Sequence, residues 1–213
     1  MRLKREMLRL YAVTDRAWVG RQTLCEQVED ALRGGATCVQ LREKQLSKEQ
    51  FLEEAKALLA LCRRYGAPLI INDRLDVALE SGADGVHVGI GDAPVAEIRQ
   101  QAGPDFIIGA TAKTVDQARA AEAAGADYLG VGAVFPSPTK QNAIRITAEQ
   151  FQEICASVSI PAVAIGGITL ENASSLRGCG ADGIAVVSAL FGAPDIARAA
   201  GALRAQAEAI AKP

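Results

Sequence analysis

The 213-residue sequence lacks the features that mark several large classes of protein. Aromatic residues make up only 4%, the formal net charge is −2, and there is no run of basic residues, so nothing indicates a nucleic-acid-binding surface. No apolar run approaches the roughly 20 residues of a membrane helix. The basic start, Met1–Arg9, is not followed by the apolar core and cleavage site of a secretory signal, so the cytoplasm is the predicted compartment.

Histidine and paired cysteines are also scarce. The single histidine, His87, has no partners at zinc-ligand spacing and no nearby serine that would form a hydrolase triad. We expect it to be a hydrogen-bonded core residue, with general acid or base as the alternative. The five cysteines are scattered and form no Cys-x-x-Cys pair, so we interpret them as reduced packing residues.

The sequence does contain a regular alternation of two kinds of segment. Short apolar runs rich in β-branched residues alternate with longer Ala/Leu/Glu/Gln/Arg-rich segments of helical composition, such as Lys48–Tyr65, Val115–Ala124 and Ile196–Ala211. Continuous apolar strands separated by helices are typical of a parallel sheet covered by helices. The eight predicted strands are Leu8–Val13, Thr37–Leu41, Leu69–Ile71, Gly85–Val88, Phe106–Ile108, Tyr128–Val131, Ala162–Ile165 and Gly183–Val187.

The residues before these strands repeat in pairs. Four strands follow a Gly-Ala pair (residues 35–36, 82–83, 125–126 and 180–181), and three others follow Pro68, Pro104 or Pro161. The two kinds alternate, which indicates a βαβα unit repeated about four times. This symmetry predicts an α/β fold of the (β/α)₈ TIM-barrel type, with residues 1–213 as one domain. A Rossmann fold is the weaker alternative, because no Gly-x-Gly-x-x-Gly follows the first strand.

Basic residues stand at the end of the second predicted strand. Period-two alternation places Gln40, Arg42 and Lys44 on one face of the chain. Cys38 shares that inward face, and Leu41 lies on the other. In a TIM barrel the reacting groups sit at the carboxyl ends of strands, so Arg42 and Lys44 predict an anion site suited to a diphosphate. The alternative is a pair of solvated surface cations.

Two aspartates follow the next strands. Asp73 comes after the third strand, in Asn72-Asp-Arg74, and Asp92 comes after the fourth. Two carboxylates on neighbouring loops are suited to Mg²⁺, which completes its coordination with water and substrate phosphates. Each aspartate has a structural alternative as a helix N-cap.

A second anion site is predicted after the last strands. The longest irregular segment, Phe135–Arg145, contains two hydroxyl side chains and Lys140, and we expect it to act as a lid. After the seventh and eighth strands come Gly166-Gly167 and Ser188, where many barrels bind phosphate on backbone N–H groups. A diphosphate site and a monophosphate site on one rim indicate a two-substrate transferase that releases diphosphate.

In this order, the motifs resemble those of the thiamine-phosphate synthase family. The resemblance covers the chain from about Leu10 to Leu190. Its most specific pieces are Gln40–Lys44, Asn72–Arg74, Gly85–Gly89 with Asp92, Phe135–Lys140, Ala164–Ile168 and Val187–Ala189.

The resemblance implies a reaction and a set of site residues. Such enzymes join 4-amino-2-methyl-5-hydroxymethylpyrimidine diphosphate to hydroxyethylthiazole phosphate with Mg²⁺, giving thiamine phosphate and diphosphate. It implies Mg²⁺ ligands at Asp73 and Asp92, and a catalytic role for Arg42, Thr111 and Lys140. The implied substrate-binding residues are Gln40, Leu41, Arg42, Glu43, Lys44, Asn72, Thr111, Ser137, Pro138, Thr139, Lys140, Gly167, Val187 and Ser188.

Three positions depart from the family pattern, and they keep alternatives open. Ile90 stands where the family often has Gln, and Thr111 and Lys113 stand where it often has Ser and His. A thiazole tautomerase of the same superfamily, another phosphate-binding barrel such as those of tryptophan biosynthesis, and a non-catalytic barrel that binds thiamine phosphate are the alternatives. The sequence does not decide whether the chain forms homo-oligomers.

Overall fold

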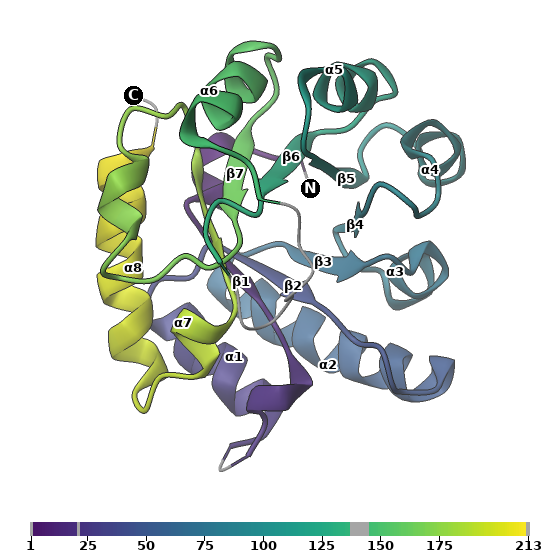
Figure 1. Ribbon diagram of the computed structural model, residues 1–213. Coiled ribbons are helices and arrows are strands. Elements are labelled where there is room, and N and C mark those ends of the chain that lie inside the picture. Colours follow the sequence, from purple (N-terminus) through teal and green to yellow (C-terminus); the bar gives the residue numbers. More distant parts are fainter. Residues whose placement is uncertain (1, 21, 137–144, 212–213) are drawn as a thin grey trace.

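The computed structural model describes residues 2–20, 22–136 and 145–211, and its strands form a closed parallel barrel. Each strand pairs with the next in sequence, and the eighth pairs with the first, as the sequence predicts for a (β/α)₈ fold. Helices surround the strands on the outside (Figure 1). The strands are β1 (Leu10–Val13), β2 (Cys38–Leu41), β3 (Leu69–Asn72), β4 (Gly85–Val88), β5 (Ile107–Ala112), β6 (Tyr128–Gly132), β7 (Ala162–Ile165) and β8 (Gly183–Val186).

The helices begin where side chains supply caps. Ser47 and Gln50, for example, form a capping box at the start of the second helix, and Gly66 ends that helix in a left-handed conformation. Within the described residues, no helix is long and apolar enough to cross a membrane. The α-helices are α1 (Leu24–Arg33), α2 (Lys48–Tyr65), α3 (Leu75–Ser81), α4 (Val95–Ala102), α5 (Val115–Ala123), α6 (Ala148–Ala156), α7 (Ser188–Phe191) and α8 (Ile196–Ile210). The 3₁₀ helices are η1 (Arg5–Leu8), η2 (Arg16–Trp18) and η3 (Ala173–Leu176).

Side chains alternate along the strands between two apolar clusters. In β1, Leu10 and Ala12 belong to the large cluster that also holds buried residues of the helices. Tyr11 and Val13 belong to a smaller cluster that fills the barrel interior. This is the period-two pattern of a strand that is buried on both faces, and it explains why the strands read as continuous apolar runs.

Two strand boundaries differ from the sequence prediction by more than one residue. Leu8 belongs to η1 and not to β1, and its side chain lies in the interior cluster. β5 continues past Gly109 to Ala112, so Thr111 lies within the strand and not after it. The prediction stopped at Ile108 because glycine and small residues are weak strand signals; here the pairing with both neighbouring strands continues the ladder.

The Gly-Ala punctuation has a structural counterpart at the amino ends of the strands. In three repeats the next residue is an aspartate whose carboxylate accepts from a main-chain N–H at or near the start of the preceding strand. These are Leu69 N to Asp84 (2.9 Å), Ile108 N to Asp127 (2.7 Å) and Ala162 N to Asp182 (2.9 Å). In the first repeat the Thr37 hydroxyl takes the same place, 3.0 Å from Leu10 N. The sequence repeat therefore marks a polar tie between successive strands.

Candidate active site

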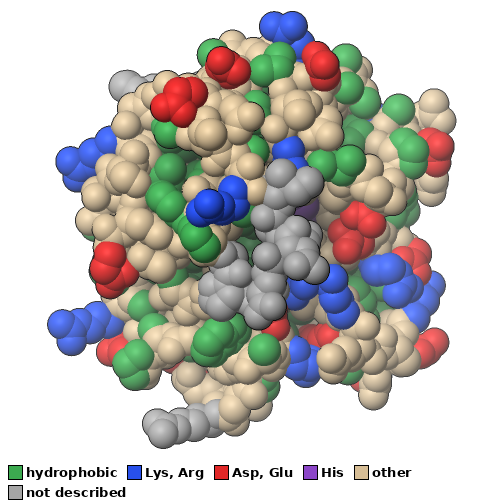
Figure 2. Space-filling view, in the orientation of Figure 1, with side chains coloured by type: hydrophobic (Ala, Val, Ile, Leu, Met, Phe, Trp, Pro, Cys, Tyr) green, Lys and Arg blue, Asp and Glu red, His purple; other side chains and the backbone are tan. Residues whose placement is uncertain are grey.

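A cavity of about 260 Å³ opens at the carboxyl ends of the strands, and each of the eight strands contributes to its wall. This is the end of a TIM barrel at which active sites are found. Figure 2 shows basic and acidic side chains gathered near the centre of the face drawn. The cavity wall carries the cations and carboxylates of the β2, β3 and β4 ends and the glycines of the β7 end.

Arg42 and Lys44 both line the cavity, as the alternation along β2 predicts. The loop after β1 fixes the arginine, because the Thr14 hydroxyl accepts from Arg42 N at 3.0 Å and Asp15 pairs with Arg42 Nη1 at 3.0 Å. An arginine held through one nitrogen keeps its other N–H groups for a ligand. The arrangement places a planar fork and a point charge on one wall, which is suited to a diphosphate.

The other two residues of this motif lie elsewhere. Leu41 is fully buried in the outer apolar cluster, and Glu43 does not line the cavity. The Glu43 side chain is 3% exposed and accepts hydrogen bonds from the main-chain N–H groups of Lys44 and Gln45. A substrate contact from Leu41 or Glu43 would therefore have to come from the main chain.

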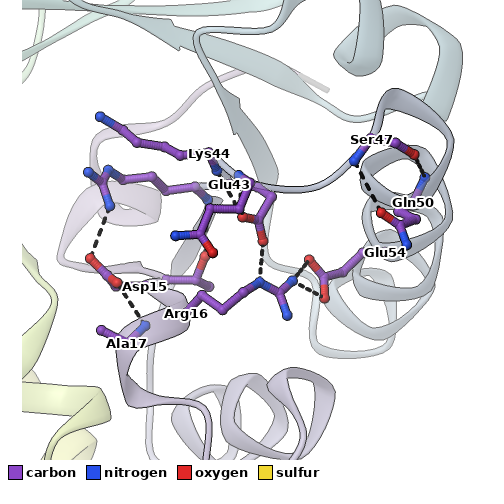
Figure 3. A network of polar contacts seen from close by, with 11 residues as sticks. Asp15, Arg16, Ala17, Glu43, Lys44, Ser47, Gln50 and Glu54 are labelled. Atoms are coloured by element: carbon purple, nitrogen blue, oxygen red, sulfur yellow. Dashed lines mark hydrogen bonds and ion pairs between the residues drawn. The ribbon is translucent and has the colours of Figure 1, made fainter.

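Arg16 holds Glu43 in this position. It lies between Glu43 and Glu54 of α2, with Nε 2.5 Å from Glu43 and Nη2 2.7 and 2.8 Å from the two oxygens of Glu54 (Figure 3). The three charges tie η2, the end of β2 and α2 together. Sequence reasoning missed Asp15 and Arg16, because the two residues precede their partners by 27 to 38 positions and carry no motif of their own.

Asp73 and Asp92 meet at the cavity edge. Neither is a helix N-cap: those positions belong to Arg74 and Pro94, without side-chain caps, so the structural alternative for both aspartates is wrong. Asp92 instead accepts from Gly89 N at 2.7 Å. Burial, and then the neighbouring Asp92 carboxylate, raise the pKa of Asp73 from 3.8 to about 6. Two carboxylates placed against each other are suited to binding a cation between them.

The chemistry of this pair fits Mg²⁺ better than a softer metal. Both ligands are carboxylate oxygens, and among the residues that the structure describes no group of three His, Cys, Asp or Glu side chains could hold a metal. Mg²⁺ is commonly bound by one or two carboxylates and otherwise by water and substrate phosphates. Asn72, the last residue of β3, lies beside Asp73 on the same wall.

The β4 and β5 ends form the floor and side of the cavity. His87 is 8% exposed and is hydrogen-bonded through both ring nitrogens, to Tyr128 and to Thr111, as expected for a core histidine. Its burial lowers its pKa to about 4, so the ring is neutral at neutral pH. Thr111 and Lys113 both line the cavity, so Lys113 faces the candidate site.

Opposite these residues, the β7 and β8 ends contribute mainly backbone. Gly167 has φ of +64°, and a Cβ there would lie 2.1 Å from Pro136 O, so only glycine fits. Asn172 holds this turn by donating to Gly167 O at 2.9 Å and accepting from Thr169 N at 2.8 Å. Val187 and Ser188, at the start of α7, complete the wall. Sequence reasoning found the two glycines and the serine but missed Asn172.

Four of the predicted site residues lie outside the described part of the chain. They are Ser137, Pro138, Thr139 and Lys140. The remaining cavity-lining predictions, from Gln40 to Ser188, come together around one cavity although they are spread over nearly 150 positions of the sequence.

Comparison with known proteins decides the family. The model of the family described as thiamine monophosphate synthase matches residues 10–190. The chain belongs to the thiamine monophosphate synthase family. It is 48% identical over 194 residues to thiamine-phosphate synthase 2 of Streptococcus pneumoniae, covering 91% of this chain and 92% of that one. It is 49% identical over 187 residues to thiamine-phosphate synthase of Ruminiclostridium cellulolyticum, covering 88% and 89%.

A solved structure agrees. Thiamine phosphate pyrophosphorylase from Pyrococcus furiosus superimposes with a TM-score of 0.89 at 43% identity, covering 97% of this chain and 98% of that one. The family match runs from the first residue of β1 to just past the start of α7, so it includes every described residue of the cavity wall. A member of the thiamine monophosphate synthase family is an enzyme of the transferase class, which confirms the class predicted from the two anion sites.

Proposed function

We propose that this chain joins 4-amino-2-methyl-5-hydroxymethylpyrimidine diphosphate to hydroxyethylthiazole phosphate, releasing diphosphate and forming thiamine phosphate. One observation carries the proposal: a chain 48% identical to named thiamine-phosphate synthases places a cationic wall and a glycine wall on opposite sides of a single cavity. The first wall is suited to a diphosphate and the second to a monophosphate, and the reacting atoms then lie between them.

The bond-breaking step belongs to the cationic wall. The bond between the pyrimidine methylene carbon and the diphosphate oxygen breaks, and its electron pair leaves with diphosphate. Arg42 and Lys44 offset the charge that builds up on that oxygen, since both face the cavity. Asp73 and Asp92 would hold Mg²⁺, which when bound supplies further positive charge to the leaving group.

The bond-forming step needs alignment and no nucleophilic side chain. The thiazole nitrogen uses its lone pair to form the new C–N bond with the methylene carbon, whose positive charge is shared with the aminopyrimidine ring. Gly167 and Ser188 would anchor the thiazole phosphate, and Gln40 and Thr111 would contact the pyrimidine. The roles proposed for Ser137, Thr139 and Lys140 stay predictions.

The alternative activities have less support. The tautomerase alternative needs an imidazole at the position of Lys113, and the single histidine is instead held by two hydrogen bonds in the cavity floor. The non-catalytic alternative rests on Ile90 and Lys113. Ile90 is 55% exposed and does not line the cavity, which removes one of its two supports. A cytoplasmic location stays a prediction.

The test is direct. Purified protein is mixed with the two substrates, with Mg²⁺ or with EDTA, and thiamine phosphate is measured. We expect product with Mg²⁺ and a loss of about 100-fold or more with EDTA. Folded protein that makes no product with any divalent ion would contradict the synthase activity. Tight binding of thiamine phosphate without turnover would favour the non-catalytic alternative.

A further inference from the structure

A chain of hydrogen bonds crosses the barrel interior beneath the cavity. Gln40 Nε2 donates to Tyr11 Oη at 2.8 Å, and the Tyr11 and Tyr128 hydroxyls are 2.7 Å apart. Tyr128 Oη lies 3.1 Å from His87 Nδ1, and His87 Nε2 lies 3.1 Å from Thr111 Oγ1. The chain thus starts and ends at two residues that line the cavity, on β2 and on β5.

The middle of this chain is closed to solvent. Tyr11 and Tyr128 are 1% and 0% exposed, and their rings stack edge to face with centroids 5.8 Å apart. Burial raises the pKa of both phenols well above 10, so each keeps its proton. In such surroundings an unmade hydrogen bond is costly, and every group of the chain is therefore held to its partner.

The barrel also leaves space for the chain. A Cβ on Gly109 would lie 2.1 Å from the Tyr128 ring and 2.5 Å from His87 Nδ1, and a Cβ on Gly130 would lie 3.0 Å from His87 Cε1. Neither glycine has a positive φ, so backbone strain does not require glycine there. Close approach of Tyr128 and His87 does require it, which shows that the position of the two side chains is built into β5 and β6.

One direction gives each hydroxyl proton of the chain an acceptor within the chain. In that direction Tyr11 accepts from Gln40 and gives its own proton to Tyr128, and Tyr128 gives its proton to His87 Nδ1. His87 then carries its proton on Nε2 and donates to Thr111. With its amide nitrogen engaged, Gln40 presents its carbonyl oxygen to the cavity as an acceptor. Thr111, which already accepts from His87, presents its hydroxyl proton as a donor.

We propose that Tyr11, Tyr128 and His87 are positioning residues that form a one-way hydrogen-bond relay and fix an acceptor at Gln40 and a donor at Thr111. An aminopyrimidine has the matching pattern, because its exocyclic amino group donates and its ring nitrogens accept. The identity of the ligand rests on the proposed function, whereas the hydrogen-bond relay itself does not depend on it. It selects an aminopyrimidine over a hydroxypyrimidine, whose oxo tautomer offers an acceptor where the amino group donates.

The first experiment reads the relay without any substrate. His87 is the only histidine, so protein labelled with ¹⁵N-histidine and freed of any affinity tag gives one pair of ring-nitrogen signals in long-range ¹H–¹⁵N NMR spectra. We expect the neutral tautomer protonated on Nε2 alone. Tyr128→Phe removes the donor to Nδ1 and should give a mixture of both tautomers. A proton on Nδ1 in the unchanged protein would overturn the proposal, because the relay would then run the other way.

The second experiment reads the ligand pattern by kinetics. Tyr128→Phe should raise KM for the pyrimidine diphosphate by about 3- to 10-fold, as expected for a misplaced hydrogen bond, and leave KM for the thiazole phosphate unchanged. Tyr65→Phe is the matched control, because Tyr65 is 42% exposed, is the last residue of α2 and takes no part in the relay, and it should change neither value. Equal increases in both KM values would mean a structural role only and would overturn the positioning role.

The two proposals fail separately. If the unchanged protein makes no thiamine phosphate, the proposed function fails, and the tautomer of His87 still decides whether the relay exists. The proposal is also overturned if turnover is normal and the tautomer is the expected one, but neither Thr111→Val nor Thr111→Ser changes KM for the pyrimidine diphosphate. The relay would then have no contact with the substrate.

Discussion

At the scale of one residue, Asp73 shows how a side chain placed for binding can destabilise the folded protein. It is the only described non-glycine residue with a positive φ, at 62°, and its carboxyl is pressed against Asp92. Its pKa of about 6 lies above the ordinary 3.8, so the charged form is less favourable in the folded protein than in the unfolded chain. The contribution of Asp73 to the free energy of unfolding is therefore fully present below about pH 4 and is lost as the pH rises through about 6.

Asp73→Asn is expected to separate binding from stability. Asparagine tolerates a positive φ and removes the charge, so with EDTA at about pH 8 the free energy of unfolding should rise by about 1 kcal/mol, a value reduced for solvent screening. At about pH 4 the difference should vanish, while Mg²⁺-dependent turnover should be lost at neutral pH. Urea unfolding at both pH values measures the first effect. A variant equally stable to the original protein at both pH values would contradict the raised pKa.

At Gly167 the surrounding atoms leave no room for a side chain. Gly167→Ala adds a Cβ that would meet Pro136 O and must adopt a left-handed φ, so we expect a cost of about 1–3 kcal/mol in stability. The turn should also shift, which raises KM for the thiazole phosphate and spares KM for the pyrimidine diphosphate. Steady-state kinetics with each substrate varied in turn tests this, with Gly20→Ala as the control because a Cβ there meets nothing within 4 Å.

At the scale of elements, the ion-pair cluster of Arg16, Glu43 and Glu54 determines the shape of the β2–α2 connection. Arg16→Gln leaves the buried Glu43 carboxylate without its cation, so the free energy of unfolding should fall by about 1–3 kcal/mol. Because Glu43 accepts from the N–H groups of Lys44 and Gln45, the cavity cation beside them should also lose its position.

The expected kinetic result for Arg16→Gln is a higher KM for the pyrimidine diphosphate with little change for the thiazole phosphate. Arg33→Gln is a matched control, since the Arg33 side chain is 64% exposed and its pair with Asp30 lies within one helix. If both variants lose the same small amount of stability and neither changes KM, the cluster does not position the loop.

At the scale of the whole molecule, closure of the barrel depends on ties between strands at its amino end. Asp182 is 1% exposed and bonds both Ala162 N and Arg5 of η1, whereas the Asp127 side chain is 34% exposed. Asp182→Ala should therefore lower the free energy of unfolding by about 3 kcal/mol, and Asp127→Ala by about 1 kcal/mol. Urea unfolding compares them; an equal loss would show that burial does not set the strength of these ties.

The alternation of apolar and polar positions decides locally where strands and helices form, and for this reason the sequence alone determined them. All eight strands, the first and last residues of α2, and the direction of Gln40 and Arg42 follow from period-two and period-3.6 patterns read over a few residues. The Gly-Ala repeat also predicts the closed barrel, because it indicates that the βα units are equivalent. Combined with the rule that barrel sites lie at strand ends, this also predicted Arg42, Lys44, Gly167 and Ser188 at the rim, and all four line the cavity.

Only the tertiary structure decided which side chains meet. Tyr11 and Tyr128 are 117 positions apart, and Arg16 reaches Glu54 across 38, so no local pattern pairs them. Their contacts depend on the register in which β8 closes against β1 and on how the loops fold over the strand ends. That register is set by the packing of the whole interior, where burial makes each polar group take the partner within reach. The sequence therefore determined which residues stand at the site, and the closed barrel determined how they are held.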